Sequence, residues 1–228
     1  LASYAFIVFI CSATFLPDVT MPKPKKTYRV IERYKIVFSN RAARFDLLSV
    51  MMVSLAFFAY ITAIPFVYLT VFKVSEFEFS LLFGMNVFAL MIAHFINTRF
   101  VANVGSRKML YFGLSLAIVM STSLLLANIF ALPLLYHVIV ILPLMGSLSM
   151  ISVNADALIL QEFAEHAGTV TAVNGTLRFG IGALAGPILA VFYDGSALPF
   201  ALLMAVSIYL VMACQLIRNK LNIAKEAV

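Results

Sequence analysis

The sequence predicts an all-α polytopic membrane protein. Of its 228 residues, 63% are hydrophobic and only 11% are charged, whereas a soluble domain is about 45–50% apolar and about 25% charged. Apolar runs long enough for a membrane helix, which needs about 20 residues, recur along the whole chain. These runs are continuous and do not alternate with polar residues, so a transmembrane β-barrel is excluded.

Two segments come before the first complete span. Residues 1–17 are apolar and lack the basic start and the cleavage site of a signal peptide, so we interpret them as the end of a membrane helix in a longer protein. Residues 18–46 are rich in lysine and arginine. Because loops of this kind stay on the cytoplasmic side of a membrane, this segment is predicted to be a basic cytoplasmic loop.

Six complete spans are predicted to form a helical bundle over residues 47–217. At about 1.5 Å per residue, each apolar run is longer than the hydrocarbon layer of about 30 Å, so each can cross it with some tilt. The predicted spans are residues 47–72, 79–101, 109–130, 132–160, 170–193 and 197–217.

The charges of the connecting segments predict the orientation. Nearly all lysines and arginines fall in loops on the same side as residues 18–46, or in the tail formed by residues 218–228. Lys73 lies in an outer loop, and Arg178 lies within a span. The positive-inside rule therefore places the C-terminus in the cytoplasm. Since the membrane orientation explains where the basic residues lie, we expect the lipid bilayer as a partner and no nucleic acid.

Six spans after a long basic loop are the layout of half a transporter. Many secondary transporters consist of two six-helix halves with the substrate site between them. We therefore expect an N-terminal six-helix half that this chain does not contain. The sequence has no phosphate-binding glycine loop and no nucleophile motif, so we do not expect an enzyme.

One run of sequence carries a family resemblance. Residues 154–187 read NADALILQEFAEHAGTVTAVNGTLRFGIGALAGP, and DGSALP follows shortly after. Together with Pro17-Asp18, the segment AYITAIPFVY and the loop VGSRKML, this run resembles the second half of the major facilitator superfamily. Within that superfamily it resembles the Bcr/CflA branch of bacterial drug-resistance transporters. The loop lacks the aspartate of the superfamily signature.

The resemblance implies both a fold and an activity. The fold is the six-helix C-terminal half of a twelve-helix major-facilitator transporter plus the end of the preceding helix, in a bacterial inner membrane. The activity is multidrug efflux by a proton-coupled antiporter through alternating access, with small hydrophobic or cationic substrates and no cofactor besides the proton gradient. The coupling carboxylates are expected in the N-terminal half. Two alternatives stay open: a metabolite-specific permease and a half that does not transport.

Asp156 and Arg178 are the strongest site candidates, because ionisable side chains inside a membrane are costly and usually functional. The resemblance implies uncharged residues at both positions. The two side chains either line the substrate cavity or neutralise each other and lock two spans together. The other candidates for the cavity are polar residues of the predicted spans, Tyr60, Thr62, Asn86, Asn154 and Asn174.

Glycines and prolines predict where helices approach closely or bend. Gly182 and Gly186 form a small-xxx-small pattern, which lets membrane helices pack closely. Pro65, Pro143 and Pro187 each remove a backbone hydrogen bond inside a predicted span, so each favours a kink.

The inner end of the bundle is predicted to hold a gate. Arg107 and Lys108 fall in a loop on the same side as Glu162, where oppositely charged side chains can pair. The three histidines are scattered along the chain, so a metal site is not expected.

Overall fold

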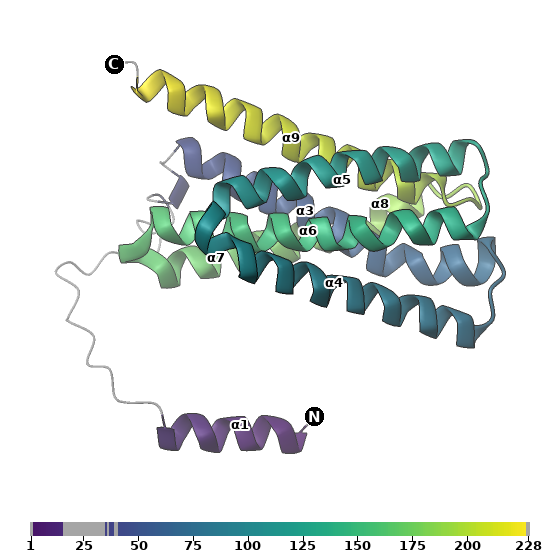
Figure 1. Cartoon of the computed structure of the whole chain (residues 1–228), viewed down its shortest axis with the longest axis horizontal. Coiled ribbons are helices and arrows are strands. Elements are labelled where there is room, and N and C mark those ends of the chain that lie inside the picture. The colour runs from purple at the N-terminus through teal and green to yellow at the C-terminus, as the bar shows by residue number, and fades with distance from the viewer. Residues whose placement is uncertain (1, 16–34, 36, 39–40, 227–228) are drawn as a thin grey trace. The chain divides into compact units, whose positions relative to one another are not determined.

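The computed structural model describes residues 2–15, 35, 37–38 and 41–226. The chain divides into two compact units, residues 1–30 and 31–228 (Figure 1). In the first unit the structure describes helix α1, Ala2–Phe15. Most of the predicted basic loop lies outside the described residues. Every regular element among the described residues is a helix, which confirms the predicted all-α class.

The second unit is a bundle of long helices. Five segments are long and apolar enough to cross a membrane: Ala43–Val71, Glu76–Val104, Ser106–Ile129, Leu134–Glu162 and Leu198–Leu221. In chain order, the elements of this unit are α3 (Arg41–Pro65), η1 (Phe66–Val71), α4 (Glu76–Val104), α5 (Ser106–Ile129), α6 (Leu134–Glu162), η2 (Ala164–His166), α7 (Ala167–Gly182), α8 (Ala185–Val191) and α9 (Leu198–Glu226).

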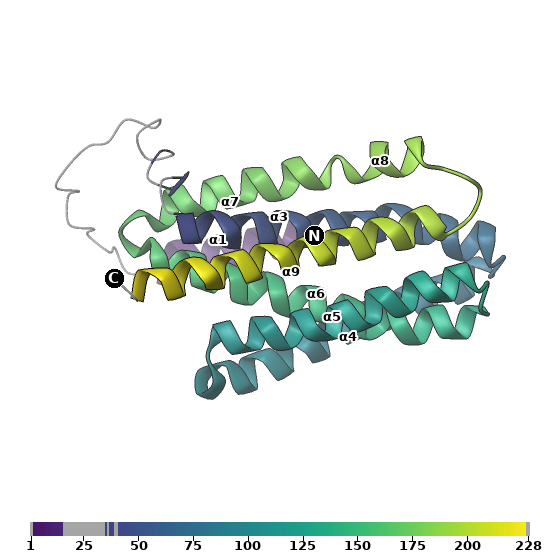
Figure 2. The ribbon, with the colours of Figure 1, turned by 90° about the horizontal axis from the view of Figure 1, so that it is seen from above.

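Helices α3 and α6 form the centre of the bundle. α3 packs against α6, α7, α8 and α9, while α6 packs against α4 and α5 as well. Figure 2 shows α7 and α8 in succession along α3, with α4, α5 and α6 grouped on the other side. Ile64 of α3 and Leu144 and Ile151 of α6 are completely buried. In a membrane such contacts stabilise the fold through close packing, because lipid tails are as apolar as the side chains.

The predicted span over residues 170–193 is not one helix. α7 ends at Gly182 and α8 begins at Ala185. The proline ring of Pro187 clashes with the carbonyl four residues earlier, that of Ala183, and Pro187 has no N–H to donate to it. Just before Pro187, the amide of Leu184 donates to the carbonyl of Ile181 at 3.1 Å, three residues earlier, where an α-helix would use the carbonyl four residues earlier. The predicted span is therefore interrupted at residues 183–184, close to the kink expected at Pro187.

The other two prolines have different local effects. Pro65 ends α3, and the π-helical segment η1 follows it directly, with the Phe72 amide bonded to the Val67 carbonyl at 3.0 Å. π-helical turns inside longer helices occur often at functional sites. Pro143 lies inside α6, which continues through it. At the other end of the bundle, α9 extends to Glu226, so most of the predicted tail is helical.

Gly182 lies where α7 meets α3. A Cβ atom added there would overlap Cδ2 of the Phe58 ring and come within 2.8 Å of its Cγ. Because Cγ is fixed close to the backbone, rotating the Phe58 ring would not relieve this overlap, so the backbone would have to shift. At Gly186, the nearest atom to an added Cβ is the Thr62 methyl at 4.0 Å. The close approach is therefore at Gly182.

We predict that Gly182→Ala lowers the free energy of unfolding by about 1–3 kcal/mol relative to its control, the usual cost of overpacking. The control is Gly180→Ala in the same helix, where no atom lies within 4 Å of an added Cβ. Both variants gain the same helix propensity, so their difference isolates the contact with Phe58. Thermal unfolding of the purified protein in detergent measures it, and equal unfolding midpoints would contradict the prediction.

Candidate functional site

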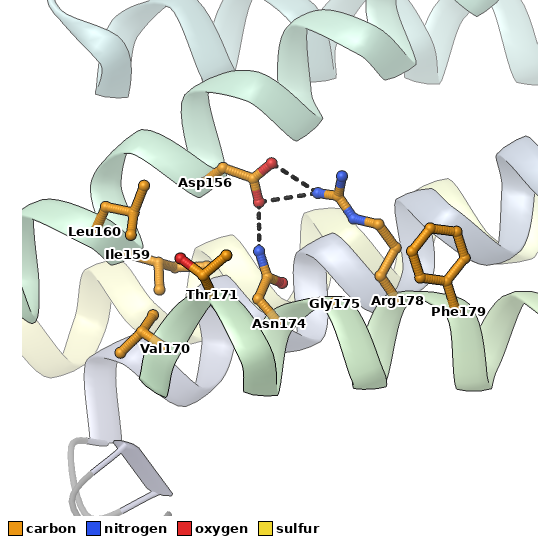
Figure 3. Close-up of a pocket in the computed structure, with 9 residues that line it drawn as sticks. All are labelled: Asp156, Ile159, Leu160, Val170, Thr171, Asn174, Gly175, Arg178 and Phe179. Atoms are coloured by element: carbon orange, nitrogen blue, oxygen red, sulfur yellow. Dashed lines mark hydrogen bonds and ion pairs between the residues drawn. The ribbon is translucent and has the colours of Figure 1, made fainter. Parts of the chain in front are cut away.

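A cavity of about 250 Å³ lies between α6 and α7 (Figure 3). Small-molecule pockets in proteins usually have volumes of about 300–1,000 Å³, so this one has room for part of a drug-sized compound. Both charged candidates, Asp156 and Arg178, lie on its wall. The lining residues are Asp156, Ile159 and Leu160 of α6, and Val170, Thr171, Asn174, Gly175, Arg178 and Phe179 of α7.

An ion pair crosses this cavity. Nη2 of Arg178 lies 2.9 Å from Oδ1 and 2.7 Å from Oδ2 of Asp156, and it also donates to the hydroxyl of Ser152 at 3.0 Å. Nδ2 of Asn174 donates to Oδ1 of Asp156 at 2.7 Å. Ser152 and Asp156 are one turn apart on α6, as Asn174 and Arg178 are on α7. The polar pair on α6 thus faces the polar pair on α7.

The ion pair is only partly shielded. The side chains of Arg178 and Asp156 are 29% and 28% exposed. α7 packs mainly on α3 and has little contact with α6. The ion pair is therefore a main connection across a loosely packed seam, and the cavity beside it is open.

The pair leaves hydrogen-bonding capacity unused. All contacts of the Arg178 guanidinium with described residues use Nη2, while its Nε is buried without a partner among them. Oδ1 of Asn174 is also buried without such a partner. Buried polar atoms are normally hydrogen-bonded, so two such atoms without a described partner, on two residues that line one cavity, call for an explanation.

Tyr60, Thr62 and Asn86 do not reach this cavity. Tyr60 is 3% exposed and stacks on Phe83 at 6.3 Å between ring centroids, and its hydroxyl has no hydrogen-bond partner among the described residues. Asn86 is 2% exposed and donates to the backbone carbonyl of Leu82. Thr62 is exposed, near Gly186. The structure therefore separates these three residues from Asp156 and Arg178.

Asn154 faces α4, away from the ion pair. Its Nδ2 donates to Oδ1 of Asn97, and also to the Met150 carbonyl one turn earlier. Both asparagines are buried, at 1% and 6% exposure. Closer to the middle of α4, Nε2 of His94 lies 2.9 Å from the hydroxyl of Ser149. The polar residues of this seam join α4 to α6.

We predict a favourable coupling between Asn97 and Asn154 of about 0.6–1.7 kcal/mol, the range found for hydrogen bonds within membrane proteins. The single variants Asn97→Ala and Asn154→Ala each leave a buried amide without its partner, whereas the double variant removes both. Unfolding midpoints of the three variants in detergent give the coupling energy. Strict additivity of the two single effects would contradict it.

Arg107, which we predicted to belong to an inner gate, pairs with a different carboxylate. Arg107 donates from Nη1 and Nη2 to the two carboxylate oxygens of Asp46, each at 3.0 Å, and not to Glu162. Arg107 lies in the first turn of α5, which packs against α9, while Asp46 lies near the start of α3, also packed on α9. In the structure Arg107 thus pairs with Asp46, and a gate formed by Arg107, Lys108 and Glu162 stays a prediction. Lys108 and Glu162 are both exposed.

Asp46 is the centre of a cluster that the sequence did not reveal. Its side chain is 4% exposed, and Nε of Arg218 also donates to it, at 2.7 Å. Gln215 donates to Asp46 and to Ser49 and accepts from Arg107. Gln215 and Arg218 are three residues apart on α9 and share one face. We assigned Asp46 to the loop and Arg218 to the tail, so their pairing was missed.

A metal ion finds no suitable group of ligands in the part of the chain that the structure describes. No three histidine, cysteine, aspartate or glutamate side chains come together there. The α6–α7 cavity offers an ion pair, an asparagine and an apolar wall.

Comparison with known proteins identifies the family. The model of the Major Facilitator Superfamily matches residues 1–187. The chain belongs to the major facilitator superfamily. It is 32% identical over 142 residues to the bicyclomycin resistance protein homolog of Haemophilus influenzae. The matched region is 62% of this chain and 36% of that protein. It is 29% identical over 150 residues to the uncharacterized MFS-type transporter YdgK of Bacillus subtilis. Here the matched region is 66% of this chain and 37% of that protein.

These matches confirm the resemblance to the major facilitator superfamily and to its Bcr/CflA branch. The matched region is a little over a third of the length of each relative. The family and the membrane-length helices together make the chain a multi-pass membrane protein of this superfamily.

Proposed function

We propose that the protein exports small drug-like compounds from bacteria across the inner membrane, in exchange for protons. The observation that carries the proposal is the open α6–α7 cavity, where an ion pair joins two helices across a loosely packed seam. The similarity to a bicyclomycin resistance protein homolog supports drug export as the direction and purpose of transport.

The ion pair suits a part that must open and close. A partly exposed pair is worth only about 0–1 kcal/mol, so breaking it during a transport cycle is cheap. Alternating access requires helices to move around a fixed site. The interruption at residues 183–184 follows α7, one of the two helices that line the cavity, and the π-helical η1 follows α3, which packs on α7. Both provide places for such bending. The carboxylates that carry the driving protons belong, in this proposal, to an N-terminal half.

Expressing the protein in cells that lack their own efflux pumps tests the proposal. We expect higher tolerance to a panel of neutral and cationic antibacterials, and energy-dependent efflux of fluorescent members of the panel. Adding a protonophore removes the proton gradient and is expected to abolish that efflux.

Three other results would contradict the proposal. Efflux that survives the protonophore would exclude proton coupling. Uptake of a metabolite without drug tolerance would favour a metabolite-specific permease. A well-expressed protein that moves no compound in either direction would favour a non-transporting half.

A further inference from the structure

We propose that the α6–α7 cavity selects uncharged compounds that present a carbonyl oxygen and rejects permanent cations. This inference rests on the proposed function, because it treats the cavity as part of the transport route. It changes the expected substrate class, in which cations stood beside neutral hydrophobic compounds.

The donors of the cavity are on Arg178. Its guanidinium carries five N–H bonds in a fixed plane and accepts none. Only Nη2 contacts Asp156 and Ser152, and Figure 3 shows the other terminal nitrogen, Nη1, pointing away from the carboxylate. Nη1 makes no hydrogen bond to a described residue and is not among the buried atoms, while Arg178 lines the cavity, so an oxygen atom of a ligand can accept a hydrogen bond from Nη1 while the ion pair stays intact. Hydrogen bonds from a charged donor are about twice as strong as those between neutral groups.

The carboxylate of the cavity is already occupied. Asp156 accepts two hydrogen bonds at Oδ1 and one at Oδ2 from Asn174 and Arg178, out of about four that a carboxylate can accept. The lining contains no other ionisable side chain, so the charges of the cavity sum to zero. A cation would have to approach a guanidinium or displace it from Asp156. A neutral acceptor meets neither obstacle.

The walls offer apolar contact beside that oxygen. Ile159, Leu160, Val170 and Phe179 supply apolar surface, and the Phe179 ring packs edge-on against Phe58 at 5.9 Å. The hydroxyl of Thr171 donates to the Ala167 carbonyl in its own helix. Since the cavity is small, it holds the carbonyl end of a compound and leaves the rest outside.

Two dyes of the same shape test the inference. The probe 10-methylacridone is neutral and carries a ring carbonyl, while 10-methylacridinium has the same three rings, a permanent positive charge and no carbonyl. Fluorescence titration of the purified protein in detergent measures both dissociation constants. We expect the acridone to bind about tenfold or more tightly than the acridinium, the value of one charge-assisted hydrogen bond.

Two variants locate the selectivity. Arg178→Lys keeps a positive charge near Asp156 but removes the planar donor group, so we expect about a tenfold loss in acridone affinity and no loss in acridinium affinity. Arg99→Lys, at an exposed position of α4, is the matched control and should change neither. Asn174→Asp adds a carboxylate of the same shape and should tighten acridinium binding, a gain that misfolding cannot produce.

Binding and efflux separate this inference from the proposed function. Equal affinity for the two dyes, no binding of the acridone, or no effect of Arg178→Lys overturns the inference. Export of both dyes at equal rates would also overturn it while supporting drug export. Selective binding of the acridone without export of any compound would support the selectivity of the cavity and overturn the proposed export.

Discussion

Replacing Asp46 with alanine is expected to lower the free energy of unfolding by about 3–5 kcal/mol, the usual cost of removing one partner from a buried ion pair. The side chain of Asp46 is 4% exposed, and it is the acid that both Arg107 and Arg218 contact. Without it, two guanidinium groups face each other with little access to water. The amide of Gln215 also loses one of its acceptors.

Thermal unfolding of the purified protein in detergent measures this loss. Glu165→Ala removes an exposed carboxylate in η2 and serves as the control, with an expected change within about 0.5 kcal/mol. A second variant, in which Asp46→Ala is combined with Arg107→Leu, removes one of the two facing cations and should recover part of the lost stability. An Asp46→Ala protein as stable as the unchanged one would show that the cluster contributes little to the fold.

The second large effect is expected on transport. Arg178→Ala should reduce efflux about 10- to 100-fold, the value of one or two hydrogen bonds to a charged group, because the variant loses the donor that meets the substrate. The amount of protein in the membrane should stay close to that of the unchanged protein, since a partly exposed ion pair contributes only about 0–1 kcal/mol to stability.

The exchanged pair Asp156→Arg with Arg178→Asp separates two explanations of that loss. It restores a bond between α6 and α7 but moves the guanidinium to the opposite wall of the cavity. We expect efflux to stay low in this double variant. Recovery of normal efflux would mean that the two side chains only hold the helices together, and would remove Arg178 from the substrate site.

The membrane helices could be predicted because the bilayer imposes their length. Each span needs a long apolar run whatever its neighbours are, so α4, α5 and α6 begin and end within a few residues of the predicted limits. The break before Pro187 was harder to foresee. A proline inside a membrane helix either kinks or ends it, and Pro143, with the same local chemistry, lies in a helix that continues.

The pairing of side chains was predictable only where two helices follow each other in the chain. Asp156 and Arg178 lie at similar depths on adjacent spans, so their contact could be expected as one of two possibilities. Arg107 and Asp46 are 61 residues apart, and Arg218 lies 172 residues from Asp46. Which of several charges meet at that distance depends on how α3, α5 and α9 pack, and a single sequence does not contain that information in a local pattern.

The Asp46 cluster also has a consequence for how the protein is made. Ribosomes deliver the bundle from α3 onward, so Asp46 enters the membrane early, while Arg218 is among the last residues of the bundle to be synthesised. Arg107 arrives between them and can pair with Asp46 first. Gln215 and Arg218 complete the arrangement only when α9 is inserted. Synthesis that stops before α9 therefore leaves the carboxylate without its bonds to Gln215 and Arg218, so the cluster is complete only in the full-length bundle.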